Sequence, residues 1–238
     1  MKFNIEKLIQ SVEVKFDKES KFFTILTERL EIRTVTFMDI PFYQTLWSDK
    51  EIMEKFGEGQ PRLYSGSNEE KQQKANRNAY YDYAEWRIAT MENSWLKRAN
   101  QGNVWTGLTI LLKDSGKKIG HIVIGGGELA YFLIPSQWGK GYGSEAASAL
   151  VQIGVPTLIN EYGAQDPGKI IATVRQDHRA SQKVLEHAGL NIDRDKIDIK
   201  EFNGIKTERY IASVDTAVLI SQLKNCNQLH KAAPRNSF

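Results

Sequence analysis

Residues Tyr131 to Ala147 read YFLIPSQWGKGYGSEAA, and this stretch decides how the rest of the chain is interpreted. The apolar run Tyr131 to Ile134 predicts a strand. Three glycines follow at alternate positions within 139–143, and an apolar helical pattern then opens at Ser144. Alternate glycines let backbone N–H groups approach a ligand closely, and a following helix directs the positive end of its dipole to the same place. The stretch therefore predicts a pyrophosphate site between a strand and a helix.

Two well-known phosphate-binding motifs fit this stretch poorly. A P-loop needs a hydroxyl residue after its Gly-Lys pair, whereas Gly139-Lys140 is followed by Gly141. The dinucleotide fingerprint is formally matched by Gly141, Gly143 and Ala146. However, its ribose-binding acid should end the next strand, and here that strand ends in Val174-Arg175. We therefore disfavour both interpretations.

The same stretch resembles the acetyl-CoA site of the GCN5-related N-acetyltransferase (GNAT) family, whose motif is Q/R-x-x-G-x-G/A. Gly141 and Gly143 fit this motif, and Trp138 stands where many members have Arg or Gln. The wording IPSQWGKGYGSEA is similar to the RimJ/RimL-like branch of ribosomal-protein-alanine acetyltransferases. Thr27 to Arg33, TERLEIR, resembles the opening strand of the same branch about a hundred residues upstream. The two matches support each other.

The resemblance implies an α+β fold, an α/β/α sandwich with a mixed sheet of about six to seven strands and a splayed pair at the CoA site. We expect a GNAT domain over 24–212, an N-terminal extension over 1–23 with a short amphipathic helix between Phe3 and Val12, and a C-terminal helix and tail over 213–238. Apolar periodicity and turn signals predict the elements within the domain. The expected strands are 27–33, 105–112, 118–124, 128–134, 169–174, 196–202 and 205–212, and the expected helices start at Asp39 and cover 68–98, 143–162 and 177–188.

Composition restricts the class of protein. The chain has 238 residues, a net charge of +3 and a single cysteine, Cys226. Such a charge gives no case for nucleic acid, and a single cysteine excludes an internal disulfide and favours a reducing compartment. The four histidines lack metal-ligand spacing, and no run approaches the about 18 apolar residues of a membrane span. We expect a cytoplasmic protein, monomer or homodimer, with no metal, membrane or nucleic-acid partner.

The resemblance also implies how acetyl-CoA is bound. Backbone N–H groups of Phe132, Leu133 and Ile134 would bind the pantetheine and polarise the thioester carbonyl. The pyrophosphate would lie on the N–H groups of the following loop. Lys140 either contacts a phosphate or is solvated. The expected cofactor-binding residues are Phe132, Leu133, Ile134, Trp138, Gly139, Lys140, Gly141, Tyr142, Gly143, Ser144, His178 and Ser181.

Three residues are candidates for proton transfer. Glu128 opens ELAYFL, which resembles the E-I/L-G-Y-W-I/L strand whose glutamate faces the acceptor; the other interpretation is a surface glutamate at a strand end. The stretch from Val174 to Gly189 resembles the helix that flanks the CoA sulfur, but Leu185 occupies the position of the tyrosine acid of some members. The thiolate would then be protonated by His178, by Ser181 or by water. His178 is equally compatible with a helix-start residue that contacts CoA.

These observations predict an acetyl-CoA-dependent N-acetyltransferase that transfers the acetyl group directly, because Cys226 lies outside every motif. The alternative is a non-catalytic acyl-CoA-binding or regulatory module. The acceptor is an amine-bearing small molecule or peptide: a protein N-terminus, an internal lysine, an amino sugar and a polyamine all remain open. The acidic residues Glu54, Glu58, Glu69 and Glu70 suit a cationic amine or a solvated face equally.

Overall fold

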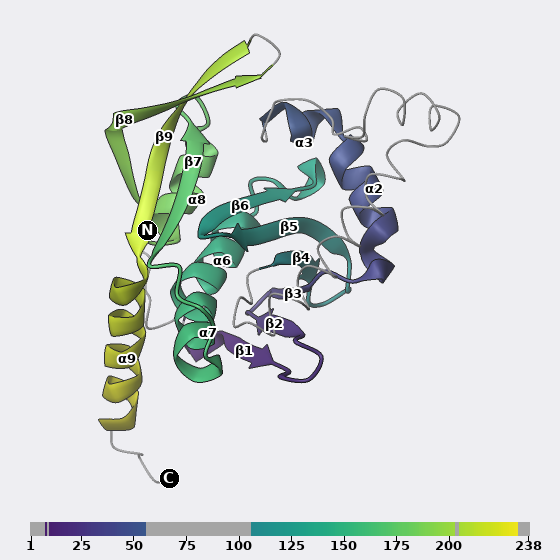
Figure 1. The fold of residues 1–238 in the computed structure, drawn as a ribbon. Coiled ribbons are helices and arrows are strands. Elements are labelled where there is room, and N and C mark those ends of the chain that lie inside the picture. The colour runs from purple at the N-terminus through teal and green to yellow at the C-terminus, as the bar shows by residue number, and fades with distance from the viewer. Residues whose placement is uncertain (1–7, 9, 56–105, 203–204, 233–238) are drawn as a thin grey trace.

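One mixed sheet forms the centre of the protein. The computed structural model describes residues 8, 10–55, 106–202 and 205–232. Within these ranges nine strands form a sheet in the order β1-β2-β3-β4-β5-β6-β7-β9-β8 (Figure 1). The strands are β1 (Glu13–Phe16), β2 (Phe23–Leu26), β3 (Leu30–Thr34), β4 (Gly107–Leu112), β5 (Lys118–Gly125), β6 (Glu128–Leu133), β7 (Lys169–Arg175), β8 (Asn191–Phe202) and β9 (Ile205–Asp215).

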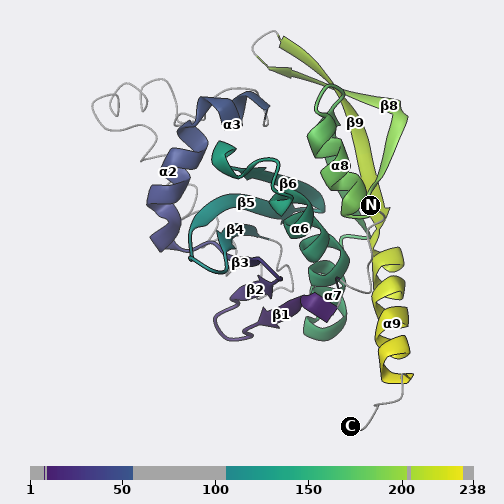
Figure 2. The same cartoon turned by 180° about the vertical axis from the view of Figure 1, so that it is seen from behind.

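Helices cover both faces of the sheet (Figures 1 and 2). One side carries α2 and α3, whose apolar residues pack against Phe132 of β6. The other side carries α6, η3, α7 and α8, and α9 packs against α7 and β9. The helices are η1 (Phe37–Asp39), α2 (Ile40–Ser48), α3 (Lys50–Lys55), η2 (Pro135–Gln137), α6 (Tyr142–Ser148), η3 (Ala149–Gly154), α7 (Val155–Tyr162), α8 (Arg179–His187) and α9 (Thr216–Ala232).

The expected α+β sandwich is confirmed, but the described residues contain nine strands rather than six to seven. The two additional strands are β1 and β2, which pair antiparallel at the edge next to β3. β1 lies in the segment that we expected to be an extension, and only residues 8, 10 and 11 of the expected amphipathic helix are described as helical. The aromatic-rich helix expected over 68–98 lies outside the described residues. None of the described helices is long and apolar enough to span a membrane.

The helix that follows the glycine-rich loop is not uniform, although the sequence predicted one helix over 143–162. It begins as α6, widens into a π-helical segment, η3, and continues as α7. Pro156 lacks an N–H and clashes with the carbonyl four residues before it, so a regular helix cannot pass through this point. The widened turn accommodates the proline, with the Val155 N–H donating to the Leu150 carbonyl. A Cβ on Gly154 would lie 2.8 Å from Ile25, which shows how closely this turn packs on β2.

β6 and β7 form the expected splayed pair. They are parallel, whereas the other neighbouring strands in the described part of the sheet are antiparallel. Among the described residues the two strands pair at one position, Glu128 with Ile171, and the Ile171 N–H donates to the Gly127 carbonyl at 2.8 Å. Beyond this point the strands separate, and the edge of β6 that faces β7 has no strand beside it.

Asp39 forms a buried ionic cluster under α2. Asp39 is the N-cap residue of this helix, which was expected to start there, but its side chain makes no capping hydrogen bond to α2. Instead, both carboxylate oxygens accept from Arg33, at 2.8 and 2.9 Å, and Lys118 lies 2.8 Å away. Burial alone would raise the pKa of Asp39, but the hydrogen bonds from Arg33 and Lys118 outweigh it and hold the pKa well below its usual range. The cluster joins β3 and β5 to the start of α2.

Replacing Asp39 tests this cluster. We expect Asp39→Asn to lower the free energy of unfolding by about 3 to 5 kcal/mol, because two cations lose their buried partner. The pKa is lower in the folded than in the unfolded chain, so the stabilisation is present in full above about pH 5 and is lost progressively as the pH falls from there toward the lower pKa of the folded chain. Urea unfolding at pH 7 and pH 3 measures both effects. Asp114→Asn, in an exposed turn, is the control, and an equal loss in both variants would contradict the assignment.

Candidate active site

A cavity of about 980 Å³ opens where β6 and β7 separate. It lies between the α2 and α3 side of the sheet and the α6 and α8 side, and its volume suits a bound small molecule. Most of the residues predicted from the sequence line it, whereas Ile134 and Lys140 do not. Those that line it are Glu128, Phe132, Leu133, Trp138, Gly139, Gly141, Tyr142, Gly143, Ser144, His178 and Ser181.

The glycine-rich loop has the backbone that its sequence predicted. Gly139 and Gly141 have φ angles of +74° and +83°, in the left-handed region that side chains other than glycine rarely adopt. Gly141 is the N-cap of α6. A Cβ on Gly143 would lie 3.3 Å from the Tyr131 ring, so this glycine lets the first turn of the helix approach β6. The loop therefore presents its backbone to the cavity at the start of a helix.

An ion pair attaches this loop to the N-terminal part of the chain. The side chain of Arg29 contacts the Glu145 carboxylate at 2.6 and 2.7 Å and donates to the Lys140 carbonyl at 3.0 Å. Glu145 also accepts a hydrogen bond of 2.6 Å from the Thr27 hydroxyl. The sequence predicted that Thr27 and Arg29 belong to a strand, but β3 begins only at Leu30. The two sequence motifs are therefore in direct contact and fix the loop.

The direction of the backbone N–H groups in β6 follows from its pairing with β5. The Ile134 N–H donates to the Ile119 carbonyl at 2.9 Å. Backbone N–H groups alternate in direction along an antiparallel pair. The N–H of Phe132, which is opposite His121, therefore also points toward β5. The N–H groups of Tyr131 and Leu133 therefore point into the gap between β6 and β7. The prediction of Phe132 and Ile134 as N–H donors to a ligand disagrees with this geometry, and that of Leu133 agrees with it.

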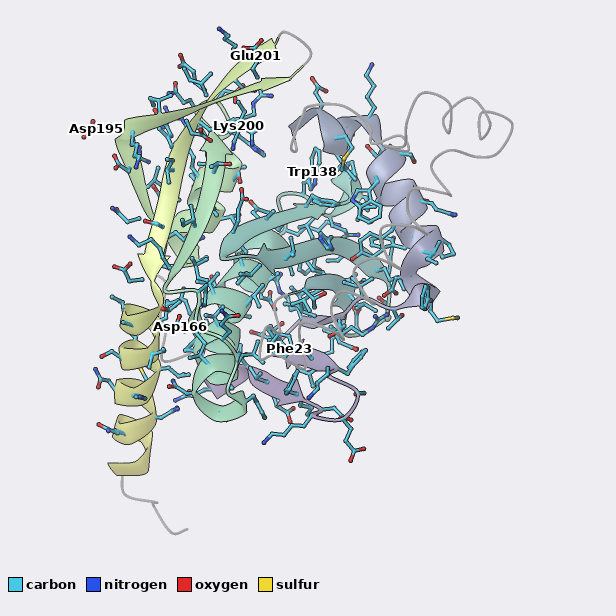
Figure 3. All side chains as sticks on the ribbon, viewed as in Figure 1. Phe23, Trp138, Asp166, Asp195, Lys200 and Glu201 are labelled. Carbon is cyan, nitrogen blue, oxygen red and sulfur yellow. The ribbon has the colours of Figure 1, made fainter. Side chains whose placement is uncertain are left out.

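Trp138 and Lys140 have contacts that the sequence did not predict. The Trp138 indole N–H donates to the Leu133 carbonyl at 2.7 Å, and its ring packs beside β6 against the apolar cluster of α2 and α3 (Figure 3). The Lys140 ammonium donates to the Gln137 side-chain carbonyl at 3.1 Å. Trp138 therefore occupies the cavity wall next to the gap, whereas Lys140 is turned toward Gln137.

The cavity is lined by a tyrosine hydroxyl, although Leu185 occupies the position of the tyrosine acid of some family members. Tyr131 of β6 donates to the Ser181 hydroxyl of α8 at 3.1 Å, and both residues line the cavity. Burial raises the pKa of Tyr131 to about 12, so its hydroxyl keeps its proton at neutral pH. Because Ser181 accepts this bond, its own proton is left to donate elsewhere. His178 also lines the cavity and is the N-cap of α8. Tyr131 matches the tyrosine of the E-I/L-G-Y-W-I/L strand motif, but no role in proton transfer was predicted for it from the sequence.

Charged side chains lie at the start of β6, the end of the strand away from the glycine-rich loop. Glu128 is exposed and lines the cavity together with Arg175 and Arg209, which are cross-strand neighbours on β7 and β9. Burial lowers the pKa of Arg209, and the neighbouring Arg175 lowers it further. Arg175 also donates to both carboxylate oxygens of Asp177, at 2.7 and 2.9 Å.

Among the four acidic residues named from the sequence, Glu54 of α3 is described. Arg175 donates to the Glu54 carbonyl oxygen at 3.5 Å, so this residue lies near the end of the cavity that Glu128 and Arg175 line. Glu58, Glu69 and Glu70 lie outside the described residues.

Comparison with known proteins gives a family and a fold. Residues 29–191 match the family "Acetyltransferase (GNAT) domain". An acetyltransferase of the GNAT family from Bacillus anthracis has 21% identity and a TM-score of 0.55, with 82% of this chain and 99% of that chain covered. Spermidine N-acetyltransferase from Vibrio cholerae, in complex with CoA and spermine, has 16% identity and a TM-score of 0.54, with coverages of 82% and 99%. Ribosomal-protein-S5-alanine acetyltransferase from Vibrio fischeri has 15% identity and a TM-score of 0.55, with coverages of 81% and 96%.

Removing the charge of Glu145 tests the attachment of the loop. We expect Glu145→Gln to lower the free energy of unfolding by about 1 to 2 kcal/mol, since Glu145 is largely buried but Arg29 is partly exposed. Chemical denaturation measures the loss. Glu186→Gln is the control, because its ion pair with Arg194 is exposed on both sides and should contribute less than about 0.5 kcal/mol. Equal stability of the two variants would show that the ion pair does not hold the loop.

Proposed function

Because the chain belongs to the GNAT acetyltransferase family, we propose that it transfers an acetyl group from acetyl-CoA directly to the amine of a small molecule or peptide. One observation carries the proposal: the separation of β6 and β7 opens a cavity that has a glycine-rich loop on one side and backbone N–H groups along its edge. These are the two features that binding a thioester attached to a pyrophosphate requires.

The residues of the loop fit the phosphate part of CoA. A Cβ added to Gly139 would meet no atom within 4 Å, so the backbone has open space in front of it. The Trp138 N–H already donates to the Pro135 carbonyl at 3.0 Å, so the N–H groups of residues 139–144 would bind the phosphates. Ser144 at the cavity wall would add a hydroxyl. The helix that continues to Tyr162 supplies a favourable dipole at this end. Phosphate oxygens would thus accept hydrogen bonds from the backbone at the start of the helix.

The edge of β6 fits the thioester part. The amine nitrogen attacks the carbonyl carbon, so negative charge develops on the carbonyl oxygen as the C–N bond forms. The N–H groups of Tyr131 and Leu133 point into the gap and would stabilise this charge. The Leu133 carbonyl accepts a hydrogen bond from the Trp138 indole N–H, so Trp138 fixes this part of the edge of β6.

Two groups would move protons. Glu128, an exposed residue of the cavity wall, would accept, through water, the proton that an ammonium acceptor must lose before it can attack. When the C–S bond breaks, the thiolate needs a proton, and the Ser181 hydroxyl would donate it while Tyr131 donates to Ser181. His178 lines the same wall, and we keep it as the alternative donor. Cys226 lies in α9 away from the cavity, which agrees with direct transfer.

The acceptor class remains that of an amine: a protein N-terminus, an internal lysine, an amino sugar or a polyamine. One observation favours a second function, an acyl-CoA-binding module without turnover. Trp138 stands where many family members have Arg or Gln, and its indole lies on the Leu133 carbonyl. Acetyl-CoA binding without turnover on any amine would support this alternative.

Acetyl-CoA binding, measured by calorimetry, tests the site. Gly139 and Gly116 have φ angles of +74° and +66°, and a Cβ at either meets nothing within 4 Å. Alanine at each position should therefore cost a similar amount of stability, about 1 to 2 kcal/mol. We expect Gly139→Ala to weaken acetyl-CoA binding by about tenfold, because the loop must keep its conformation to bind. Gly116→Ala, in a distant turn, should not. Absence of binding to the parent protein would contradict the proposed function.

Turnover tests the role of Glu128. A thiol-release assay with a panel of amines and peptides should show that Glu128→Gln lowers kcat by about 10²- to 10⁴-fold, the usual contribution of a general base. Acetyl-CoA affinity should stay unchanged. Glu161→Gln, an exposed position on α7, is the matched control. If Glu128→Gln keeps the turnover of the parent, Glu128 is not the base.

A further inference from the structure

A histidine that the mechanism above does not use lines the same cavity. His121 of β5 is 5% exposed and lies on the side of the sheet that carries α2. It is directly opposite Phe132 in the β5–β6 register, and the two ring centroids are 5.2 Å apart. Tyr131 and Leu133, whose N–H groups face the gap, flank Phe132 in the chain. His121 therefore lies beside the part of β6 where the thioester would bind.

A row of hydrogen bonds leads from His121 to the buried carboxylate of Asp39. The Nδ1 atom of His121 is 2.7 Å from the Tyr43 hydroxyl oxygen. That oxygen is 3.2 Å from the Thr109 hydroxyl, which donates to Asp39 at 3.1 Å. All four side chains are buried.

The direction of this row fixes which ring nitrogen carries the proton. Asp39 is ionised and can only accept, so the single proton of Thr109 is directed to it. Thr109 must then accept from Tyr43, and burial raises the pKa of Tyr43 far enough that its hydroxyl keeps this proton. With its own proton directed to Thr109, Tyr43 accepts from the Nδ1–H of His121. The neutral imidazole therefore has its lone pair on Nε2.

The row orients His121 but does not conduct protons away from it. Because Arg33 and Lys118 hold the pKa of Asp39 well below its usual range, Asp39 is a poor proton acceptor. A proton taken up by Nε2 would stay on the ring until it passes to water. The hydrogen bond of Nδ1 to Tyr43 thus holds the ring in the tautomer in which Nε2 can act as a base.

The acceptor nitrogen releases two protons during the reaction. An ammonium acceptor loses one proton before attack, and its nitrogen loses a second after the C–N bond forms. Glu128 and Phe132 are four residues apart on β6, roughly 13 Å at about 3.3 Å per residue. Glu128 at the start of β6 is thus well separated from the part of the cavity next to His121.

We propose that His121 accepts the second proton: its Nε2 takes the proton from the acceptor nitrogen once that nitrogen is bonded to the carbonyl carbon, and Tyr43 and Thr109 position the ring. The N–H electron pair stays on nitrogen as the amide forms, the C–S bond breaks, and the thiolate is protonated from Ser181. His121 then returns its proton to water, and Ser181 regains a proton from water. This inference rests on the proposed acetyl transfer.

His121→Asn separates this role from a structural one. The asparagine amide can occupy the place of Nδ1–H and donate to Tyr43, but it provides no group at the place of Nε2. We expect an unchanged acetyl-CoA Kd by calorimetry, and a fall in kcat of about 10²-fold or more in the thiol-release assay. Tyr43→Phe should lower kcat by about tenfold with an unchanged acetyl-CoA Kd, because His121 remains but loses its orientation.

The outcomes are distinct. A His121→Asn kcat within threefold of the parent overturns the inference and leaves the acetyltransferase proposal intact, whereas a parent protein that binds no acetyl-CoA removes both. Should His121→Asn fail to fold, the tautomer of the parent protein decides. Nitrogen-15 chemical shifts that show a proton on Nδ1 support the inference, and a proton on Nε2 overturns it.

Discussion

The site depends on one constraint, the single register position at which β6 and β7 are joined. After Glu128 and Ile171 the strands separate, so the N–H groups of Tyr131 and Leu133 lose the neighbours that a continuous sheet would provide. Backbone donors inside a protein need a partner. A ligand that runs along this edge would take the place of the missing strand. A sheet with β6 and β7 fully paired would be complete and would have no cavity here.

Two polar clusters hold the parts on either side of this gap. On the side of the sheet that carries α6, Arg29 and Glu145 join the turn before β3 to the glycine-rich loop, although they are more than a hundred residues apart in the chain. On the other side, Asp39 joins β3 and β5 to α2, and α2 carries Tyr43 toward His121. Both clusters involve residues next to or within β3. The opening strand of the domain therefore supports both walls of the cavity.

The sequence was sufficient for the glycine-rich loop and for the strands and helices from β3 onward in the described residues, because alternate glycines and apolar periodicity are local signals. The sequence was insufficient for features that depend on how strands pair with one another. Whether Phe132 or Leu133 directs its N–H into the gap depends on the register with β5, which no local pattern specifies. The contact of Tyr131 with Ser181 and the row from His121 to Asp39 join residues from separate elements. The number of strands differed because β1 and β2 are only four residues long and lie within or next to the segment that we expected to be an extension.

Both margins of the sheet are built in ways that discourage another chain from adding a strand. β1 is short, and its exposed Glu13 and Lys15 form an ion pair at 3.1 Å. β8 carries seven charged residues among its twelve and is interrupted by a bulge between Asp193 and Ile197. Lys200 and Glu201 project from its outer end (Figure 3). Charged, short or bulged edges oppose edge-to-edge aggregation. Self-association of this protein would therefore use a helical or sheet face rather than extension of the sheet.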